Sequence, residues 1–475
     1  MTLNTMKNPA LSLAATTLAA SLPLLSCHAA AETPASRPNI VILLADDLGY
    51  GDLSCNGNTL HETPNIDRLS REEARFSRFY TAPISSPTRT GLLTGMFPSR
   101  LGLRDNVCKP WLSFGMDTQY ETMADVLGQA GYSNRAIVGK WHLGSSAEYW
   151  PTSRGFTHFY GCVNGAIDYF LHERDGQLDW HNDRQNSYDK GYSTDLIADH
   201  AVSCIENYVK DGPFFLYVAF NAPHEPLQAK DADIQYYAQK MGKNMDALTP
   251  AEKRKATYAA MVGCLDQGVG RIIAQLKRSN LWDNTMVLFF SDNGPIQIGT
   301  TPYRGKKNQE FDGGLRAPAY MHWPGVVKGN SDIAQLTGFI DILPTLRDYL
   351  GITDKPKYPY DGISVLSVLN GSKENIVRDL YLGRGAMVSQ NFKFIFQKSN
   401  PSLKLQHDFL CYYPNNPLEE RNEIGSDDPI FKAEAARLAA LTAELDRQIP
   451  ENRVDDSSSP PQGYVPMKNW NPFGY

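Results

Sequence analysis

Residues 39–45 read Asn-Ile-Val-Ile-Leu-Leu-Ala, an uninterrupted run that is rich in β-branched and aliphatic side chains. Such a run is typical of a strand that is buried on both faces, as in a parallel sheet. Segments of the same character lie at 134–138, 214–219 and 285–290. Together these segments predict the centre of a parallel sheet.

Helical patterns occupy the chain between the predicted strands. The clearest of them lie at 122–130, 193–209 and 255–276. Strands that alternate with helices indicate an α/β fold, and we therefore predict a large, mostly parallel sheet that is flanked by helices.

The chain changes character toward its C-terminus. Residues 379–382 and 392–396 alternate as antiparallel strands do, and 429–449 has the pattern of an amphipathic helix. We therefore predict a main α/β domain over 35–370 and a smaller C-terminal α+β subdomain over 371–475, with a small antiparallel sheet and a helix.

The end of the chain combines a polar stretch with aromatic residues. Residues 455–461 are rich in Ser and Pro, so we expect them to be loose. Trp470 and Phe473 follow this stretch, and both are candidates for docking on the folded protein.

The beginning of the chain has the composition of an export signal. Lys7 precedes an apolar stretch at 10–27, and small residues follow that stretch as they do at a cleavage site. We therefore predict a signal peptide over 1–31 and an exported protein, periplasmic or secreted. Residues 24–27 also resemble a bacterial lipobox, so a lipid anchor through Cys27 is an alternative. No later stretch is long and apolar enough to span a membrane.

The overall composition is that of a soluble globular protein. Hydrophobic residues make up 42% of the 475 residues and charged residues 21%, with a net charge of −6. This charge argues against a nucleic-acid binder, because nucleic-acid affinity depends on a basic surface. A local basic pocket for a small anion remains compatible with it.

The cysteines beyond Cys27 are scattered along the chain. They are Cys55, Cys108, Cys162, Cys204, Cys264 and Cys411. None belongs to a C-x-x-C pair, which argues against a zinc cluster. Export permits disulfides, but their connectivity cannot be read from the sequence, so bridges and free buried thiols both stay open.

A polar cluster follows each predicted strand. In chain order these clusters are Asp46-Asp47, Lys140-Trp141-His142, His224 and Asp292-Asn293. In an open α/β sheet, functional sites gather at the carboxyl ends of the strands. We therefore expect these side chains to meet at one edge of the sheet.

Four of these residues would supply only oxygen ligands: Asp46, Asp47, Asp292 and Asn293. Adjacent carboxylates repel each other unless a cation joins them. Oxygen ligands suit Ca²⁺, and less well Mg²⁺, rather than zinc. Taken alone, each pair has a simpler interpretation, a helix cap for the first and a turn for the second.

Residues 85–95 read Ser-Ser-Pro-Thr-Arg-Thr-Gly-Leu-Leu-Thr-Gly. Pro87 is tolerated in the first turn of a helix, which places Ser85 at a helix N-terminus, where an anion is stabilised. A plain N-cap serine is the alternative. The Leu-Thr-Gly that follows at this offset favours a functional site.

This stretch resembles the signature of sulfatases, Cys/Ser-x-Pro-x-Arg-x-x-x-Leu-Thr-Gly, within the alkaline-phosphatase superfamily. The resemblance extends over nearly the whole chain beyond the signal peptide. It includes the segments 63–69, 139–144, 303–316 and 416–422. It implies a sulfuric ester hydrolase with a large α/β domain and a small C-terminal subdomain.

The resemblance implies that Ser85 is oxidised to Cα-formylglycine by a formylglycine-generating enzyme. The aldehyde would hydrate, and one oxygen of the hydrate would attack sulfur. A metal bound by the oxygen cluster and by the modified Ser85 itself would polarise both the sulfate and the hydrate oxygen. A serine here resembles that of enzymes matured by an anaerobic activase. A serine that replaces a native cysteine, in a trapped inactive form, would look the same.

Further catalytic roles follow from the same resemblance. Arg89 would steady the modified residue, and Lys140 and Lys307 would bind sulfate oxygens. His224 would protonate the departing sugar oxygen, and His142 would then take the proton from the remaining hydroxyl.

The resemblance also separates Lys307 from its neighbour Lys306. Four residues lie between Lys307 and Asp312, which is the spacing that the family shows before its acidic Gly-Gly. Histidines without such a match are interpreted as ordinary residues; these are His158, His200, His322 and His407.

The substrate is indicated by a single loop. Residues 165–174 resemble the corresponding stretch of N-acetylgalactosamine-4-sulfatases, which makes Asp168 and His172 candidate sugar contacts. A plain surface turn is the alternative for both, and Trp180 nearby is expected in the core. The expected substrate is a sulfated glycan of galactose or galactosamine type, such as carrageenan or chondroitin.

Two other functions remain as alternatives. The first is a phosphatase or phosphodiesterase of the same superfamily, which would need further metal ligands. The second is an inactive, glycan-binding homologue in which Ser85 stays unmodified.

Overall fold

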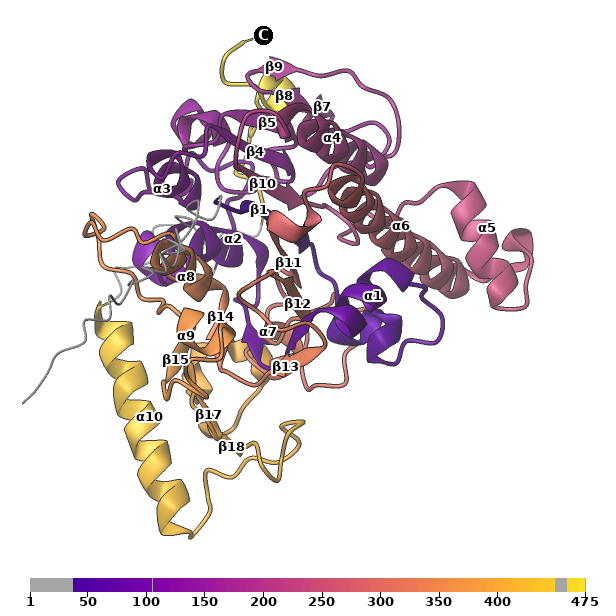
Figure 1. Ribbon diagram of the computed structural model, residues 1–475. Helices are drawn as coiled ribbons and strands as arrows, with labels where there is room; N and C mark the ends of the chain where they lie inside the picture. Colours follow the sequence, from indigo (N-terminus) through magenta and orange to yellow (C-terminus); the bar gives the residue numbers. More distant parts are fainter. Residues whose placement is uncertain (1–36, 105, 449–458, 475) are drawn as a thin grey trace, which may run out of the picture. The chain divides into compact units, whose positions relative to one another are not determined.

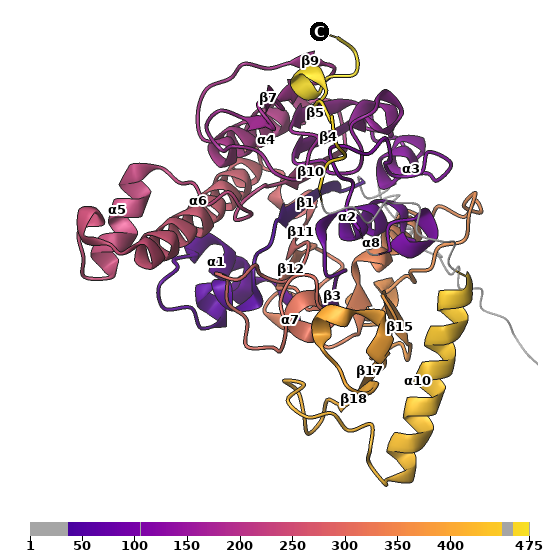
Figure 2. The same ribbon diagram turned by 180° about the vertical axis from the view of Figure 1, so that it is seen from behind.

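The computed structural model describes residues 37–104, 106–448 and 459–474. The predicted signal peptide over 1–31, with Cys27, lies outside these described residues, as does part of the predicted loose stretch. Figure 1 shows the chain coloured from its beginning to its end, and Figure 2 shows it from behind.

The main sheet has ten strands in the order β13-β2-β12-β11-β1-β10-β4-β5-β8-β9. Its centre is parallel and consists of β11 (Thr285–Ser291), β1 (Asn39–Ala45), β10 (Phe214–Ala219) and β4 (Asn134–Gly139). These are the strands that the apolar runs predict, and each bound agrees within one residue. The predicted fold class is therefore confirmed.

Shorter strands extend the sheet on both sides. Beyond β11 lie β12 (Ala319–His322), β2 (Ala74–Phe76) and β13 (Ser331–Ile333), and beyond β4 lie β5 (His158–Gly161), β8 (His181–Asn182) and β9 (Gln185–Asn186). β12 is antiparallel to both of its neighbours, and β8 and β9 form an antiparallel hairpin. Two small pairs lie outside this sheet: β3 (Phe79–Tyr80) with β14 (Thr337–Gly338), and β6 (Glu173–Arg174) with β7 (Gln177–Leu178).

Helices cover both faces of the sheet because its strands are apolar on both. Successive side chains of β1 alternate between two cores, with Ile40, Ile42 and Leu44 in one and their neighbours in the other. One face is covered by α1 (Pro64–Glu72), α4 (Ser193–Tyr208) and α6 (Pro250–Arg278), and the other by α2 (Ser85–Thr94), α3 (Met123–Gln129) and α8 (Ile342–Tyr349). α5 (Asp231–Lys240) packs on α6, and α7 (Asp312–Leu315) and α9 (Leu366–Leu369) are single turns.

The C-terminal part contains the predicted antiparallel sheet and helix. The sheet consists of β15 (Leu380–Gly383), β16 (Ala386–Val388), β17 (Phe392–Ile395) and β18 (Phe409–Tyr412), and α10 (Pro429–Gln448) packs on it. The buried Lys393 of β17 pairs with Asp312 at 2.9 Å and with Glu419 at 2.8 Å. The pair with Asp312 joins the small sheet to α7, which precedes β12 of the main sheet.

The end of the chain returns to the main sheet near β8 and β9 (Figure 1). Trp470 is 1% exposed, and its indole N–H donates to the carbonyl of Arg174 at 2.8 Å. Phe473 stands edge-on to Trp150. Docking of the two aromatic residues is therefore confirmed, whereas the domain boundary at residue 370 stays a prediction.

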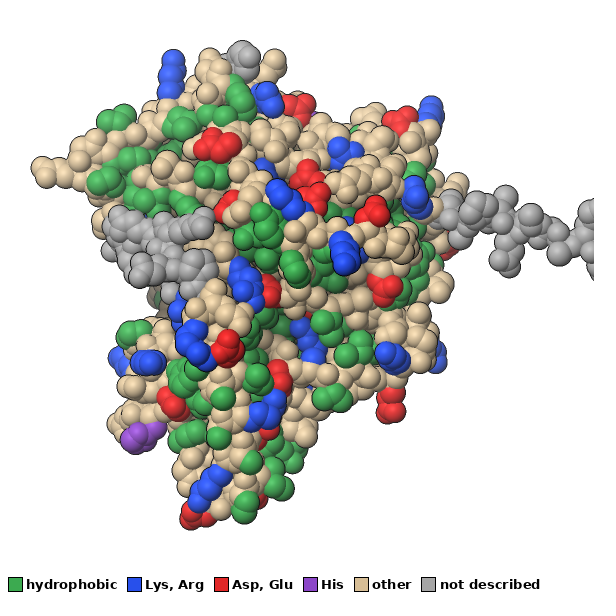
Figure 3. All heavy atoms as spheres, turned by 90° about the vertical axis from the view of Figure 1, so that its left-hand side faces the viewer, with side chains coloured by type: hydrophobic (Ala, Val, Ile, Leu, Met, Phe, Trp, Pro, Cys, Tyr) green, Lys and Arg blue, Asp and Glu red, His purple; other side chains and the backbone are tan. Residues whose placement is uncertain are grey.

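The surface carries charges of both signs. On the face drawn in Figure 3, Lys and Arg side chains are interspersed with Asp and Glu, so this face offers no extended basic surface for a nucleic acid. Within the described ranges, every helix is too short or too polar to cross a bilayer. The six described cysteines are free thiols, and all but Cys55 are buried.

Candidate active site

The predicted clusters meet at the carboxyl edge of the parallel strands. Asp46 and Asp47 leave β1, while Asp292 and Asn293 leave the adjacent β11. The backbone N–H of Asp47 donates to Asp292 Oδ1 at 3.1 Å, and Asn293 Nδ2 donates to Asp47 Oδ1 at 2.7 Å. All of these side chains are 0% exposed, so parallel pairing of two strands assembles one buried oxygen cluster.

Basic side chains from three other segments balance the carboxylates. Lys140 follows β4 and pairs with Asp46 at 2.5 Å, and Lys307 lies 2.7 Å from Asp47. Arg89, on the second turn of α2, binds Asp292 Oδ2 through Nε at 3.1 Å and Nη2 at 2.9 Å. The carboxylates of the cluster and the basic side chains around them therefore form direct ion pairs.

These charges decide the protonation of the carboxylates. Burial raises the pKa of Asp46, but Lys140, His224 and Arg89 outweigh it, and the net pKa lies below the ordinary 3.8. Burial also raises the pKa of Asp47, but the charge of Lys307 contributes to a larger opposite effect, so the net pKa of Asp47 is lowered as well. Both carboxylates are therefore ionised at neutral pH.

The donor set fits a hard divalent cation. Ligand atoms of Asp46, Asp47 and His224 lie within 4.8 Å of one another, and hydrogen bonds link Asp292 and Asn293 to the same group. Ionised carboxylates and an amide oxygen are the ligands that Ca²⁺ and Mg²⁺ prefer. The residues chosen from the sequence are thus in one place and of the right chemistry.

Ser85 is the first residue of α2 and faces this cluster. Its Oγ donates to Asp46 Oδ1 at 3.1 Å and lies 3.4 Å from Asn293 Oδ1. The unpaired backbone N–H groups at the start of a helix favour a negative charge beside this residue. The helix therefore sets Ser85 between the oxygen cluster and a position suited to an anion.

His142 follows β4 and lines the same cavity as Ser85. Its backbone N–H donates to the carbonyl of Val163, beyond β5, at 3.1 Å, and its carbonyl accepts from Ser86 Oγ at 2.8 Å. Its Nδ1 is buried and has no partner among the described residues. Burial and then the charges of Lys140 and Arg89 hold its pKa well below 6.5, so the imidazole is neutral at pH 7.

His224 comes from the loop after β10. Its Nδ1 lies 2.5 Å from the carbonyl oxygen of Glu225, and its Nε2 lies 3.6 Å from Asp47 Oδ2. Burial first, and then the charge of Lys307, lowers its pKa below 6.5. Its side chain is 21% exposed, so it can meet both the cluster and a ligand from outside.

A cavity of about 310 Å³ opens over these groups. Ser85, His142, His224 and Lys307 are among the residues that line it. Trp111 and Arg174 line it as well, and neither is among the site residues chosen from the sequence. The Trp111 indole N–H is buried and without a partner in the part of the chain that the structure describes.

Asp168 and His172 do not line this cavity, although the loop that contains them does. Asp168 accepts hydrogen bonds from the backbone of Phe170 and Leu171 and from Gln228, at 2.6–2.9 Å. His172 is 2% exposed and stacks on Trp180, which is itself in the core as predicted. Their role as sugar contacts stays a prediction.

Gly165, Ala166 and Arg174 of the 165–174 loop line the cavity, and Arg174 is the charged residue among them. The sequence offered a signal for it, because an arginine suits a sulfated or carboxylated ligand. Two contacts orient this loop and could not be predicted from the sequence. One is the turn at Asp168, and the other is the hydrogen bond from Trp470 to the Arg174 carbonyl.

Comparisons with known proteins agree with this geometry. A family model described as Sulfatase matches residues 38–352. Arylsulfatase J of Mus musculus is 32% identical over 323 residues, which cover 66% of this chain and 52% of the relative. N-acetylgalactosamine-6-sulfatase of Mus musculus is 30% identical over 360 residues, 70% of this chain and 66% of the relative. The chain thus matches between about half and two thirds of the length of these relatives.

A solved structure is similar over more of its length. The crystal structure of Ps i-CgsB in complex with k-i-k-neocarrahexaose has a TM-score of 0.76 to this chain at 28% identity. The match covers 88% of this chain and 94% of that one. The similarity therefore extends over more of this chain than the residues 38–352 that the family model matches.

Proposed function

The chain belongs to the sulfatase family, with its alkaline-phosphatase-like fold, and we propose that it hydrolyses sulfate esters on a sulfated glycan. The observation that carries this proposal is the position of Ser85. Its Oγ lies at the start of α2, bonded to Asp46 and lining the cavity. A nucleophile at this position would have a cation site behind it and an open path to substrate in front.

The proposed nucleophile is Cα-formylglycine made from Ser85 by a sulfatase-maturing enzyme. The modification supplies a hydrated aldehyde, whose hydroxyls are better placed for attack on sulfur and for later release than a serine hydroxyl. Arg89 lies one helical turn further on and contacts both Asp292 and the carbonyl of Lys140. We assign it the role of holding residue 85 and the carboxylates in register.

The basic residues would stabilise the negative charge of the substrate. A sulfate ester is an anion, and negative charge moves onto the departing oxygen as the S–O bond breaks. Lys140 and Lys307 are fixed on the carboxylates of Asp46 and Asp47, with Lys307 lining the cavity. Fixed cations stabilise this charge without having to reorganise during the reaction.

The two histidines are assigned the proton transfers. His224 contacts Asp47 and lines the cavity, where its protonated form, favoured by the negative charge of a bound sulfate ester, would donate a proton to the departing sugar oxygen. His142 also lines the cavity and is neutral, so it can accept the proton that regenerates the aldehyde at residue 85. Separate acid and base groups allow each proton to move over a short distance.

Asp46, Asp47, Asp292 and Asn293 would hold the metal, and we favour Ca²⁺ over Mg²⁺. They supply only oxygen ligands from two adjacent strand ends, and Ca²⁺ accepts more oxygen ligands in less regular geometry than Mg²⁺ does. The bound cation would polarise the sulfate group.

We further propose a substrate of galactose or galactosamine type, such as carrageenan or chondroitin. The similar crystal structure holds a neocarrahexaose, and one relative is named for N-acetylgalactosamine. The wall of the cavity combines an indole with a free N–H, at Trp111, and a guanidinium, at Arg174. These groups suit a sugar ring with a second anionic substituent. Asp168 and His172 remain candidates for contacts further along the glycan.

The predicted signal peptide and the proposed sulfated glycan substrate both indicate a protein that acts outside the cytoplasm. A polymer of this kind does not enter a cell, so the enzyme would meet it in the periplasm or outside. We therefore propose export, with a lipid anchor through Cys27 as the alternative.

The test is sulfate release from carrageenans, chondroitin, dermatan, heparin and fucoidan by protein matured in its native host. We expect release from a galactose-type polymer, and a loss of at least about 10⁴-fold in Ser85→Ala. Ser187→Ala, which changes a surface serine outside the cavity, is the matched control and should keep full activity.

Two further measurements separate the alternative functions. Mass spectrometry should show the peptide with residue 85 lighter by about 2 Da after oxidation of serine to the aldehyde. An unmodified peptide from an active host would favour the glycan-binding alternative. Faster turnover of an aryl phosphate than of the aryl sulfate would favour a phosphatase.

A further inference from the structure

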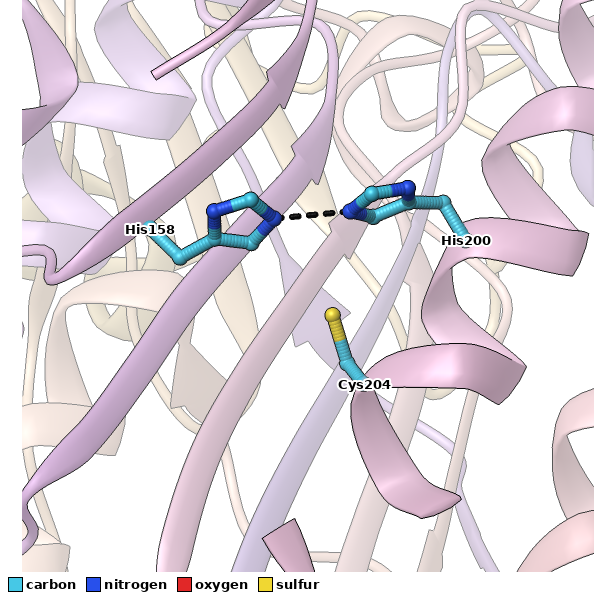
Figure 4. A group of neighbouring side chains, drawn as sticks. All are labelled: His158, His200 and Cys204. Carbon is cyan, nitrogen blue, oxygen red and sulfur yellow. Dashed lines mark hydrogen bonds between the residues drawn. The ribbon is translucent and has the colours of Figure 1, made fainter. Parts of the chain in front are cut away.

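A second group of metal-ligating side chains lies on the sheet side of α4, away from the cavity. His158 begins β5, while His200 and Cys204 lie on α4. The Nε2 atoms of the two histidines are 2.7 Å apart, and one ligand atom from each of the three residues lies within 4.8 Å of the others. Figure 4 shows the two rings facing each other, with the sulfur of Cys204 turned toward the gap between them.

The fold places these ligands on rigid elements. His200 and Cys204 are four residues apart on α4, so they lie on the same face one turn from each other. α4 packs against β5, which brings His158 opposite that face. Ligands on a helix and a strand are held more firmly than ligands on a loop.

Neighbouring groups fix the orientation of both rings. His158 Nδ1 lies 3.0 Å from Asp183 Oδ1, and the same oxygen accepts the backbone N–H of Phe159 at 3.0 Å. A carboxylate on Nδ1 directs the lone pair of Nε2 toward the gap, as carboxylates behind zinc-bound histidines do. His200 is stacked flat on Tyr160, with ring centroids 3.9 Å apart.

The group is partly accessible to solvent. The His158 side chain is 21% exposed, whereas Cys204 is 4% exposed. An ion can therefore enter from solvent and keep a water as a further ligand, while the thiol stays protected inside.

We propose that His158, His200 and Cys204 bind a zinc-type divalent ion. Two imidazole nitrogens and a thiolate are the ligands that Zn²⁺ prefers, and water would complete a tetrahedral site. As the ion enters, the thiol proton and the proton between the two Nε2 atoms leave to solvent. The absence of C-x-x-C pairs in the sequence does not bear on such a site, because its ligands come from separate elements.

The position of the site indicates what the ion would do. Cys162 and Val163 directly follow β5. Their backbone carbonyls accept hydrogen bonds from the backbone N–H groups of Trp141 and His142, respectively. A metal that ties β5 to α4 would thus brace the strand that holds His142. Its expected role is structural, and its loss should lower thermal stability more than turnover.

The experiment uses the full chain after chelation and removal of the chelator. Co²⁺ is added and the visible spectrum recorded, because a thiolate–Co²⁺ charge-transfer band requires the sulfur and cannot arise from the oxygen cluster. Zn²⁺ is then titrated by calorimetry. We expect the band in the wild type, its loss in Cys204→Ser, and loss of the corresponding Zn²⁺ binding in both His200→Ala and Cys204→Ser.

Matched controls keep the test specific. Cys264→Ser changes another buried thiol, and His322→Ala another histidine, so both should bind Zn²⁺ as the wild type does. Asp183→Asn leaves the ligands in place and should weaken binding by about 10- to 100-fold. Zn²⁺ should also raise the melting temperature of the wild type but not of Cys204→Ser.

Two results would overturn the proposal. One is a Co²⁺ spectrum without the thiolate band in correctly folded wild type, as judged by circular dichroism. The other is equal Zn²⁺ binding in wild type, His200→Ala and Cys204→Ser, which would assign the ion to another place. Either result would leave the two histidines as a hydrogen-bonded pair.

Discussion

The oxygen cluster behind Ser85 and the group formed by His158, His200 and Cys204 offer opposite kinds of ligand in opposite surroundings. The first consists of ionised carboxylates and an amide that are 0% exposed, and fixed lysines and an arginine contact them. The second consists of two imidazoles and a thiol, and the His158 side chain among them is 21% exposed and bonded to Asp183.

The comparison shows that the burial of a metal-binding side chain determines how many charged or hydrogen-bonding neighbours it needs. A carboxylate without solvent must have cations beside it in every state of the protein, so its neighbours are fixed by the fold. A half-exposed imidazole needs only a hydrogen bond, so an ion can come and go. The first cluster is therefore costly to disturb, and the second is open to exchange.

The largest effect is expected from metal removal. Chelation should lower the rate of sulfate release by about 10³-fold or more, because the oxygen cluster would lose its polarising ion. Added Ca²⁺ should restore the rate, whereas Zn²⁺ should not. Cys204→Ser should follow the wild type throughout this series. Recovery with Zn²⁺ alone would place the catalytic ion elsewhere.

Replacement of a buried lysine should be the next largest effect. Lys140→Met removes the ion-pair partner of Asp46, and we expect the free energy of unfolding of the chelated protein to fall by about 3–5 kcal/mol. Urea denaturation measures this change. The matched control is Lys240→Met, whose partner Glu62 is exposed, and it should cost about 1 kcal/mol or less. Similar costs in both variants would refute the role given to burial.

A third carboxylate sharpens the comparison because it is buried without a cation. Asp266 of α6 accepts the backbone N–H groups of Asn65 and Ile66 at the start of α1, and burial raises its pKa from 3.8 to about 6. Since the folded state holds this proton more tightly than the unfolded state, the contribution of Asp266 to stability decreases as pH rises from about 4 to 6.

The loss over this window is about 3 kcal/mol for a shift of this size. Asp266→Asn lacks the titration, so the stability difference between wild type and variant should shrink by about this amount between pH 4 and pH 7. Denaturation curves at both pH values measure it. A difference that is constant with pH would show that this carboxylate does not titrate in the window.

The smallest effect concerns the wall of the cavity. Arg174→Ala should raise KM for the sulfated polymer by about 10-fold and leave kcat nearly unchanged, because it removes a charge-assisted contact away from Ser85. Arg184→Ala, an arginine close in sequence that does not line the cavity, should leave KM unchanged. A fall in kcat alone would place Arg174 among the groups that act on the reacting sulfate.

Local sequence patterns determined the strands, the main helices and most of the candidate catalytic cluster. Apolar runs such as 39–45 predict strands, and polar residues directly after them fall at one sheet edge once the strands are parallel. The motif at 85–95 adds the helix and its arginine. These features depend on residues that are close together in the sequence, so they could be predicted without the tertiary structure.

Tertiary structure alone decided which other side chains share a site. Arg174 reaches the cavity while Asp168 turns into its own loop, because backbone hydrogen bonds and the docked Trp470 set the direction of that segment. His158 meets His200 and Cys204 only because β5 packs on α4. Contacts between segments far apart in the chain depend on packing, and no local pattern of the sequence records them.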